Sequence, residues 1–265
     1  MDLERGTYLK ISIITAVFNS KKTIACCIES VRKQRYKPEH IIIDGQSSDG
    51  SVEIINRCRM NDSIFLSEPD RGFYDAINKG LRMASGDVIG ILNADDMYAN
   101  NVVLERVMDS FEKSISESCY GDLVYVDPID TEKVCRYWSA GSFHAGRFLR
   151  GWMPPHPTFF VRREIYEKYG GFNLELGTAA DYELMLRFLV KHEITTQYIP
   201  EVLIKMRMGG QSNATLRRRL LANRMDRMAW KVNGLRPYPW TLILKPLSKI
   251  GQYFAKPPEP NSSTL

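Results

Sequence analysis

Short apolar runs alternate with stretches of helical periodicity along the first hundred residues of this chain. The runs are rich in β-branched residues and too short for most helices, which is typical of buried strands in a parallel sheet. They cover residues 11–17, 41–43, 64–66 and 88–92. Apolar positions at helical spacing cover residues 24–31, 51–60 and 77–84. This alternation predicts an α/β fold with a mostly parallel sheet flanked by helices.

Polar residues follow three of these strands. They are Thr15 and Asn19 at the first, Asp44 at the second, and Asp95 and Asp96 after the fourth. In an open α/β sheet, ligands bind in the crevice beyond the carboxyl ends of the strands. Two adjacent aspartates repel each other unless a cation or hydrogen-bond donors neutralise them, and carboxylate oxygens suit Mg²⁺ or Mn²⁺. The alternative is that one caps the next helix and the other is solvated.

Two further acidic residues in this half have both a structural and a functional interpretation. Asp44 can accept a hydrogen bond from a ribose or a base, or it can close an Asx-turn over the following loop. The segment 68–80 (EPDRGFYDAINKG) places Arg71 and Lys79 near the crevice, and its Asp75 either caps a helix or contacts a ligand. No glycine-x-glycine-x-x-glycine follows any of these strands, which argues against a dinucleotide-binding dehydrogenase.

The second half of the chain is less periodic. Residues 121–127 (GDLVYVD) alternate and predict a strand at the edge of a mixed sheet. Residues 138–157 are rich in Gly, Pro and aromatic residues, so we interpret them as a loop near the site whose rings, such as Trp152, can stack on sugar. His156 precedes a strand at 158–161, and its role is either structural or functional.

Asp181 heads the apolar side of a helix that includes Leu184, Met185 and Phe188. At that position the carboxylate points inward instead of toward water. It either stabilises the helix N-terminus through the helix dipole or acts in a site.

The composition is that of an ordinary globular protein, with 265 residues, 44% hydrophobic and 25% charged. The sequence has no long apolar run and its first ten residues lack the apolar core of a signal peptide, so we expect a cytoplasmic protein. The five cysteines form no C-x-x-C pair, which argues against a zinc site or a disulfide framework. We expect them to be buried small hydrophobes in a reducing compartment.

The net charge of +5 conceals an asymmetry. From Val202 onward there are twelve Lys/Arg and two Asp/Glu, so the tail is strongly basic and the rest is mildly acidic. Arginines border an apolar side between 216 and 232, which predicts a basic amphipathic helix within a tail of residues 211–256. This helix either rests on an anionic membrane surface or packs on the domain. No recognition motif accompanies the basic residues, so we expect no nucleic-acid partner, and we expect residues 257–265 to be disordered.

Four segments, TAVFNS, IIIDGQSSDGS, EPDRGFYDAINKG and ASGDVIGILNADD, occur in this order between residues 15 and 96. Together they closely resemble the nucleotide-binding half of family 2 glycosyltransferases. The resemblance runs from about Lys10 to about Gly210 and implies a Rossmann-like fold of the GT-A type. It implies a glycosyltransferase domain at 1–210, with a nucleotide-binding half at about 10–115 and an acceptor half at about 116–210.

The resemblance also implies roles for individual residues. The residues expected to hold the nucleotide are Thr15, Asn19, Asp44, Asp75 and Asp95. Asp95 is expected to face the ribose and the metal, and Asp96 to be the main ligand of Mg²⁺ or Mn²⁺. Many family members have an aspartate where this chain has Asn93.

In the acceptor half, the resemblance implies that His156, with Trp152 nearby, contacts the diphosphate or the acceptor. It places the catalytic base at Asp181. The family usually has Glu-Asp there, whereas this chain has Ala180-Asp181.

The implied activity is that of a metal-dependent hexosyltransferase. A glycosidase needs a carboxylic acid to protonate its leaving group, but a divalent metal can neutralise a leaving diphosphate, so one base is enough. We therefore expect transfer with inversion from a nucleoside-diphosphate sugar to a hydroxyl of a saccharide or lipid-linked acceptor. The expected setting is cell-envelope polysaccharide or glycolipid assembly, with the protein peripheral on the inner face of the membrane.

Two alternatives remain open. The first is a nucleotide-sugar-binding protein without transferase activity, for which Asn93 and Ala180 are the grounds. The second is a sugar nucleotidyltransferase, which would need a glycine-rich basic loop after the first strand. The turn Phe18-Asn19-Ser20 is not such a loop.

Overall fold

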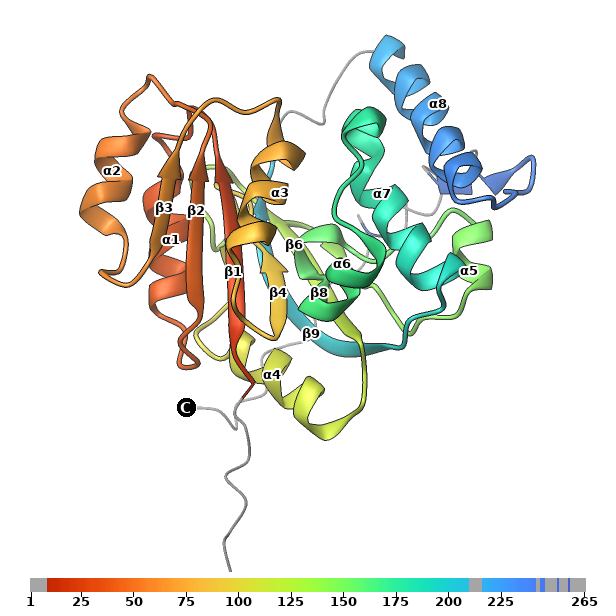
Figure 1. Cartoon of the computed structure of the whole chain (residues 1–265), viewed down its shortest axis with the longest axis horizontal. Coiled ribbons are helices and arrows are strands. Elements are labelled where there is room, and N and C mark those ends of the chain that lie inside the picture. The colour runs from red at the N-terminus through yellow and green to blue at the C-terminus, as the bar shows by residue number, and fades with distance from the viewer. Residues whose placement is uncertain (1–8, 210–215, 242–243, 246–251, 253–256, 258–265) are drawn as a thin grey trace, which may run out of the picture.

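The structure is a computed structural model that describes residues 9–209, 216–241, 244–245, 252 and 257, and only the backbone of residues 216–222. Its helices surround one mixed sheet (Figure 1). The strands are β1 (Ile11–Val17), β2 (Glu39–Asp44), β3 (Ile64–Ser67), β4 (Val88–Ile91), β5 (Met97–Tyr98), β6 (Ser118–Val126), β7 (Val134–Trp138), β8 (Phe160–Arg162) and β9 (Thr196–Arg207). The α-helices are α1 (Ile24–Arg32), α2 (Ser51–Cys58), α3 (Phe73–Met83), α4 (Val103–Lys113), α5 (Gly146–Leu149), α6 (Arg163–Tyr169), α7 (Ala180–Met185) and α8 (Leu216–Val232). The shorter turns of helix are η1 (His156–Thr158), η2 (Leu174–Ala179) and η3 (Leu186–Lys191).

Strands β3, β2, β1 and β4 lie in this order and are parallel, as the sequence predicts. Every residue of β1 is buried, because helices cover both faces of a parallel sheet. The register pairs Val17 with Asp44, and Asp44 with Ser67. The carboxyl ends of the first three strands therefore meet at one edge, as predicted.

Helix α3 packs closely on β1 at a glycine. A Cβ added to Gly80 would lie 2.4 Å from Cγ2 of Ile14, so a larger residue would push the helix off the sheet. This close contact fixes the position of α3, whose first turn carries Tyr74 and Asp75.

The second half of the sheet is mixed. Strand β8 is antiparallel to both β4 and β6, β9 is parallel to β6, and β7 is antiparallel to β6. The prediction of an edge strand at 121–127 is wrong, because β6 lies between β8 and β9 and only Tyr125 of its residues is not buried. The error arose because β9, which pairs with β6, was not predicted as a strand. It contains Pro200 and Glu201 and shows little apolar alternation.

Helix α8 begins and ends at the residues predicted for the tail helix. Figure 1 shows it beside α7, at the end of the molecule opposite α2. Ala229 and Trp230 are buried, and Trp230 Nε1 donates to the Tyr182 hydroxyl at 3.0 Å. Within the described ranges, no helix combines the length and apolarity needed to cross a bilayer. The predicted disordered terminus, 257–265, lies outside the described residues apart from residue 257.

The cysteines differ in part from the expectation. All five are free, as expected, and Cys27 and Cys119 are buried. However, Cys26 and Cys135 are exposed, so the prediction that all are buried is wrong. Neighbouring residues of a helix point about 100° apart, so Cys26 and Cys27 lie on different sides of α1. Cys27 lies on the buried side and Cys26 on the exposed side.

Candidate functional site

Asp44 ends β2 with a fully buried side chain. Its Oδ2 accepts a hydrogen bond from the main-chain N–H of Ser47 at 3.0 Å and from the Ser67 hydroxyl at 2.7 Å. Its Oδ1 has no hydrogen-bond partner among the described residues. The contact with Ser47 closes the loop, as the structural interpretation expects. The second oxygen still requires a donor, since buried polar atoms are rarely left unpaired.

The two candidates on the first strand lie in different environments. Thr15 is fully buried, and its hydroxyl is 3.0 Å from Nε2 of His40, so the side chain faces the interior. Asn19 is exposed in a left-handed conformation with φ of 48°. Its Oδ1 accepts from Ser48 N–H at 3.0 Å and its own N–H donates to the Ser47 hydroxyl at 2.8 Å. Asn19 therefore joins the loop after β1 to the loop after β2, and the roles of both residues in nucleotide binding stay predictions.

Asp75 is buried in the first turn of α3. It accepts the Arg71 main-chain N–H at 3.0 Å and pairs with the Arg71 guanidinium at 2.9 Å. These hydrogen bonds lower the pKa of Asp75 to about 2. Both oxygens are engaged by Arg71, so Asp75 connects α3 to the loop before it, but it does not cap the helix, whose N-cap is Gly72. Its predicted contact with the nucleotide stays a prediction.

The acidic motif after β4 places its two aspartates differently. Asp95 is half-buried, and its main-chain carbonyl accepts from Arg207 Nη1 at 2.6 Å. Asp96 is fully buried, and its Oδ2 accepts from the Asn93 amide at 2.6 Å. Burial, and then the charge of Asp95, raise the pKa of Asp96 well above its usual value. Asn93 thus supplies a donor to Asp96, which an ionised aspartate at that position could not do.

The pair formed by Asp95 and Asp96 fits a divalent cation. Asp96 Oδ1 is buried and has no hydrogen-bond partner in the described part of the chain, and a cation would relieve both this unpaired oxygen and the repulsion between the carboxylates. Asp95 is the more exposed of the two, and the expectation that Asp96 is the main metal ligand stays a prediction. Across the described residues no group of three or more acidic, His or Cys side chains is arranged to hold a metal. We call Asp44, Asp95 and Asp96 the strand-edge site.

Asp181 lies in the first turn of α7, half-buried, and its Oδ1 accepts the N–H of Tyr182 at 2.7 Å. Two other side chains respond to its charge. Burial lowers the pKa of His156 while Asp181 opposes this shift, and burial, then Asp181, raise the pKa of Tyr74 well above 10. His156 Nε2 is buried and has no hydrogen-bond partner among the residues described. The Phe172 ring contacts the rings of both Tyr74 and His156. We call Asp181, His156, Tyr74 and Phe172 the Asp181 cluster.

Trp152 is anchored in the aromatic loop. Its Nε1 donates to the Ala140 carbonyl at 2.9 Å, the Arg147 guanidinium lies 4.3 Å from its ring centroid, and Tyr120 meets it edge-on. Much of the ring is therefore already in contact with protein. The predicted contact of Trp152 with sugar stays a prediction.

Asp122 was not recognised from the sequence. It is buried on β6 and accepts from Ala140 N–H at 2.7 Å, from the Tyr198 hydroxyl at 2.8 Å and from the Tyr137 hydroxyl. The signal was present, because a lone carboxylate in an apolar strand must find donors. Asp122 fixes the start of the aromatic loop.

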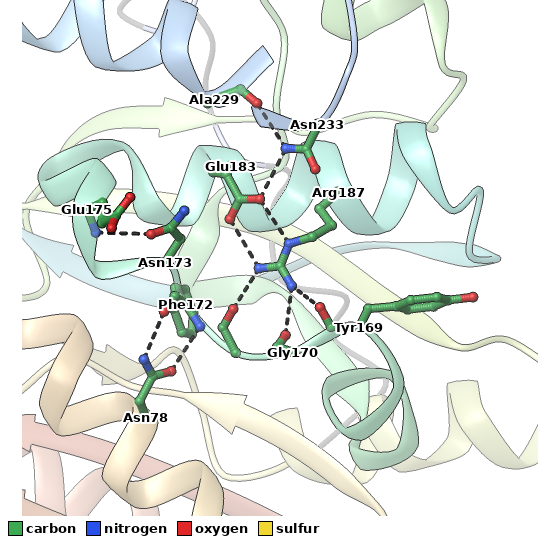
Figure 2. Close-up of polar contacts among 11 residues, drawn as sticks. Asn78, Tyr169, Gly170, Phe172, Asn173, Glu175, Glu183, Arg187, Ala229 and Asn233 are labelled. Carbon is green, nitrogen blue, oxygen red and sulfur yellow. Dashed lines mark hydrogen bonds and ion pairs between the residues drawn. The ribbon is translucent and has the colours of Figure 1, made fainter. Parts of the chain in front are cut away.

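The two halves of the molecule meet at Phe172. Its main-chain N–H and carbonyl both pair with the side-chain amide of Asn78 on α3, each at 2.9 Å (Figure 2). Tyr74, four residues earlier on α3, stacks on the Phe172 ring. The structure therefore joins His156, through Phe172, to the helix that follows β3, and neither Tyr74 nor Phe172 was a predicted site residue.

The loop of residues 169–171, which leads to this contact, is also held by Arg187. Its guanidinium donates to the carbonyls of all three residues, at 2.9 Å for the second and 2.6 Å for the third, and it pairs with Glu183 at 2.9 Å (Figure 2). The Glu183 side chain is only 3% exposed, and it also accepts from Asn233 at 3.1 Å. Asn233 directly follows α8, so this helix contributes to the support of the loop.

A sequence profile described as Glycosyl transferase family 2 matches residues 12–170, which is more than half of the chain. The chain belongs to glycosyltransferase family 2. The matched segment includes the whole strand-edge site, together with Tyr74 and His156, and ends before Phe172 and Asp181.

Two relatives extend this assignment. An uncharacterized glycosyltransferase of Mycobacterium tuberculosis is 33% identical over 181 residues, which are 67% of this glycosyltransferase and 68% of that protein. A PGL/p-HBAD biosynthesis glycosyltransferase of Mycobacterium bovis is 29% identical over 215 residues, with 79% and 82% coverage. The second match is the longer.

Solved structures confirm the predicted GT-A fold of this family 2 glycosyltransferase. A mannosyltransferase of Pyrobaculum calidifontis, in complex with GDP-Man and Mn²⁺, superposes with a TM-score of 0.63 at 17% identity, covering 90% of this chain and 69% of that one. TarS 1–349 of S. aureus, in complex with UDP-GlcNAc, gives 0.64 at 16% identity, with 89% and 69% coverage.

Proposed function

We propose that this glycosyltransferase moves a hexosyl group, with inversion, from a nucleoside-diphosphate sugar to an acceptor hydroxyl. The observation that carries the proposal is the unpaired, buried Oδ1 of Asp96 beside Asp95, at the edge where Asp44 also ends its strand. An acidic site in which one oxygen of each buried carboxylate has no hydrogen-bond donor among the described residues suits a cation bound to a diphosphate. The donors named for the two solved structures, GDP-Man and UDP-GlcNAc, are of this class.

In this proposal, each residue has a limited task. A Mg²⁺ or Mn²⁺ ion held by Asp95 and Asp96 would neutralise the charge that develops on the leaving diphosphate. Asn93 holds the Asp96 carboxylate in place through its amide. Asp181 accepts the proton of the attacking hydroxyl, and the half-buried position of its side chain leaves it accessible to an acceptor. Attack opposite the leaving group inverts the anomeric centre.

A donor panel tests the proposal directly. The full chain is incubated with UDP-, GDP- and dTDP-hexoses, with Mn²⁺ or with EDTA, and release of nucleoside diphosphate is followed with and without candidate glycolipid acceptors. We expect one donor class to turn over, and EDTA to abolish the turnover. Binding of a donor without any turnover would instead support the alternative of a nucleotide-sugar-binding protein. Turnover that EDTA leaves intact would overturn the role of the metal.

We further propose that the acceptor is presented at an anionic membrane surface. The C-terminal segment exposes four large apolar side chains, Met228 (37%), Val232 (49%), Tyr238 (49%) and Trp240 (52%). Four cations on the same segment, Arg224, Arg227, Lys231 and Arg236, are also exposed. Exposed aromatic rings together with cations suit the interface of an anionic bilayer. The name of the Mycobacterium bovis relative, which includes PGL/p-HBAD biosynthesis, is consistent with a glycolipid product.

Vesicle sedimentation tests this second proposal. We expect the chain to sediment with phosphatidylglycerol-containing vesicles but not with pure phosphatidylcholine, and the double variant Tyr238→Ser, Trp240→Ser to lose binding. The matched control is Ile115→Ser with Ile129→Ser. These two apolar side chains are 98% and 95% exposed, but they do not belong to the C-terminal segment that is proposed to bind the membrane. Equal binding by both double variants, or none by the wild type, would remove the membrane from the proposal.

A further inference from the structure

The acidic motif lies beyond the last pairing of β4. The Leu92 N–H donates to the Ile14 carbonyl at 3.0 Å, and the chain pairs with a neighbouring strand again at β5. The residues between form a tight turn, in which the Asp96 N–H donates to the Asn93 carbonyl at 3.0 Å. The sheet therefore delivers the motif to its edge, but other contacts must fix the turn that carries the two aspartates.

Helix α1 packs against this turn. Cys27 on α1 is fully buried, and its thiol donates to the Asn93 carbonyl at 3.4 Å, the same carbonyl that accepts from Asp96. One helical turn later, the Ser30 hydroxyl accepts from the Tyr98 N–H at 3.3 Å and donates to the Cys27 carbonyl at 2.7 Å. Asp96 lies between these two contacts along the chain. The turn is therefore held from α1 on both sides of its buried carboxylate.

Gln34 continues this series just after the end of α1. It is only 1% exposed, and its side-chain amide donates to the Asn100 carbonyl at 2.6 Å and accepts from the Leu104 N–H at 3.1 Å. A buried amide is costly unless its polar atoms are paired, and here both the nitrogen and the oxygen bind the segment that follows the acidic motif. Cys27, Ser30 and Gln34 are three and four residues apart, which places them on one side of a helix. We call these three residues the α1 stripe.

We propose that the residues of the α1 stripe are positioning residues for the metal site: they hold the turn so that the carboxylates of Asp95 and Asp96 can share one ion. This inference rests on the proposed function, in which these two aspartates bind Mg²⁺ or Mn²⁺. Asn93 links the stripe to the site, because its carbonyl accepts from Cys27 while its amide donates to Asp96. Residues that orient the ligands of a metal commonly change its affinity by about 10- to 100-fold when they are replaced.

The test measures Mn²⁺ binding by the full chain without any turnover. Mn²⁺ is titrated in the presence of UDP, GDP or dTDP, and electron paramagnetic resonance reports the free ion. We expect the double variant Cys27→Ala, Ser30→Ala to raise the dissociation constant for Mn²⁺ about 10- to 100-fold. Each single variant should give about 3- to 10-fold, the ratio that corresponds to one ordinary hydrogen bond. Cys27→Ser should stay within about twofold of the wild type, because its hydroxyl can donate to the same carbonyl.

The matched control carries the same two substitutions elsewhere, Cys26→Ala with Ser110→Ala. Cys26 is the exposed neighbour of Cys27 on α1, and Ser110 lies on α4, where its hydroxyl donates to Gln197 at 3.0 Å. We expect this control to bind Mn²⁺ as the wild type does. Urea unfolding of both double variants gives their stability. If the stripe only supported the fold, the double variant of the stripe would lose stability and keep its affinity for Mn²⁺.

A second measurement needs no metal. Amide hydrogen exchange at Asp96, in the absence of Mn²⁺, reports how often its N–H separates from the Asn93 carbonyl. We expect exchange at this amide to be about tenfold faster in Cys27→Ala, Ser30→Ala than in the wild type, and unchanged in the control. Equal exchange in all three proteins would show that the stripe does not hold the turn, and the inference would be wrong.

The failure of the inference can be distinguished from that of the proposed function. If the wild type binds Mn²⁺ and the double variant of the stripe binds it equally well, the inference is overturned and the proposed function stands. If the wild type binds no Mn²⁺ with any of the three nucleotides, the role of the metal in the proposed function is overturned, and the inference with it.

Discussion

The strand-edge site and the Asp181 cluster are built in opposite ways. Asp44 ends β2, and Asp95 and Asp96 come after β4. Both strands pair in parallel with β1, so the ladder alone brings these residues to one edge. The Asp181 cluster draws on α3, η1, the loop after α6, and α7. The rings of Tyr74 and His156 both contact Phe172, whose main chain pairs with Asn78 on α3. The comparison teaches that the proposed donor site depends on the sheet, whereas the arrangement around the proposed base depends on tertiary contacts that local changes can disturb.

The largest expected effect separates the two regions by function. Asp181→Asn should lower kcat by about 10²- to 10⁴-fold, the usual size of a general-base contribution, and leave donor binding intact. Asp95→Asn should instead weaken metal-dependent donor binding, because it removes a charge that would neutralise part of the charge of the proposed ion. Calorimetric titration of the donor with Mn²⁺, together with rate measurements, checks both variants. Asp109→Asn, in an exposed pair with Lys113, is the control. Near-wild-type turnover in Asp181→Asn would remove that residue from the mechanism.

A smaller but global effect tests how far the Asp181 cluster depends on its buried support. Glu183→Gln leaves Arg187 without its charged partner, so we expect a loss of roughly 3–5 kcal/mol in the free energy of unfolding. Urea denaturation measures this loss. The matched control is Glu167→Gln, whose partner is Arg163 and whose side chain is 59% exposed, for which less than about 1 kcal/mol is expected. Equal losses would show that the buried pair gives no special support.

The smallest effect concerns the amino-terminal end of the sheet, away from both regions. Burial of Glu39 opposes its ionisation, but hydrogen bonds from Ser12, Ser85 and Lys10 outweigh this and lower its pKa to about 2. A depressed folded-state pKa contributes stability that is complete above about pH 4.5 and disappears as the pH falls toward 2. Glu39→Gln should therefore cost on the order of 2 kcal/mol at pH 7 and progressively less at pH 3.

Urea unfolding at several pH values measures this difference. The control variant is Glu29→Gln, whose side chain is 36% exposed and whose partner is Arg32. A cost for Glu39→Gln that does not change with pH would contradict the assigned cause. Donor binding at pH 7 should be unaffected, because Glu39 lies at the start of β2 and Asp44 at its end.

What could be predicted from the sequence follows the same division. The strands that end at Val17 and Asp44 could be predicted because their β-branched runs are uninterrupted. The common edge at which their polar residues lie follows from the parallel pairing of the strands. The tail helix was also found, because its periodicity is long. Strand β9 was missed, and with it the interior position of β6, since pairing partners distant in the chain leave no local signal.

The candidate site shows the same limit. Asp181 could be singled out as a carboxylate at the head of an apolar helix face. Tyr74 and Phe172 could not, because 98 residues of chain separate them and only the fold places their rings together. The donor that Asn93 gives to Asp96 was likewise hidden, since the sequence shows only that a charge is missing there.

The hydrogen bond from Asn233 to Glu183 has a consequence for where this domain can be cut. The family profile ends at residue 170, and the resemblance in sequence fades near residue 210. A fragment ending there would keep every residue proposed to act on donor and acceptor. It would, however, leave the buried Glu183 carboxylate short of one donor and remove the Trp230 side chain that contacts Tyr182. The autonomous folding unit is therefore longer than the segment by which its ancestry is recognised.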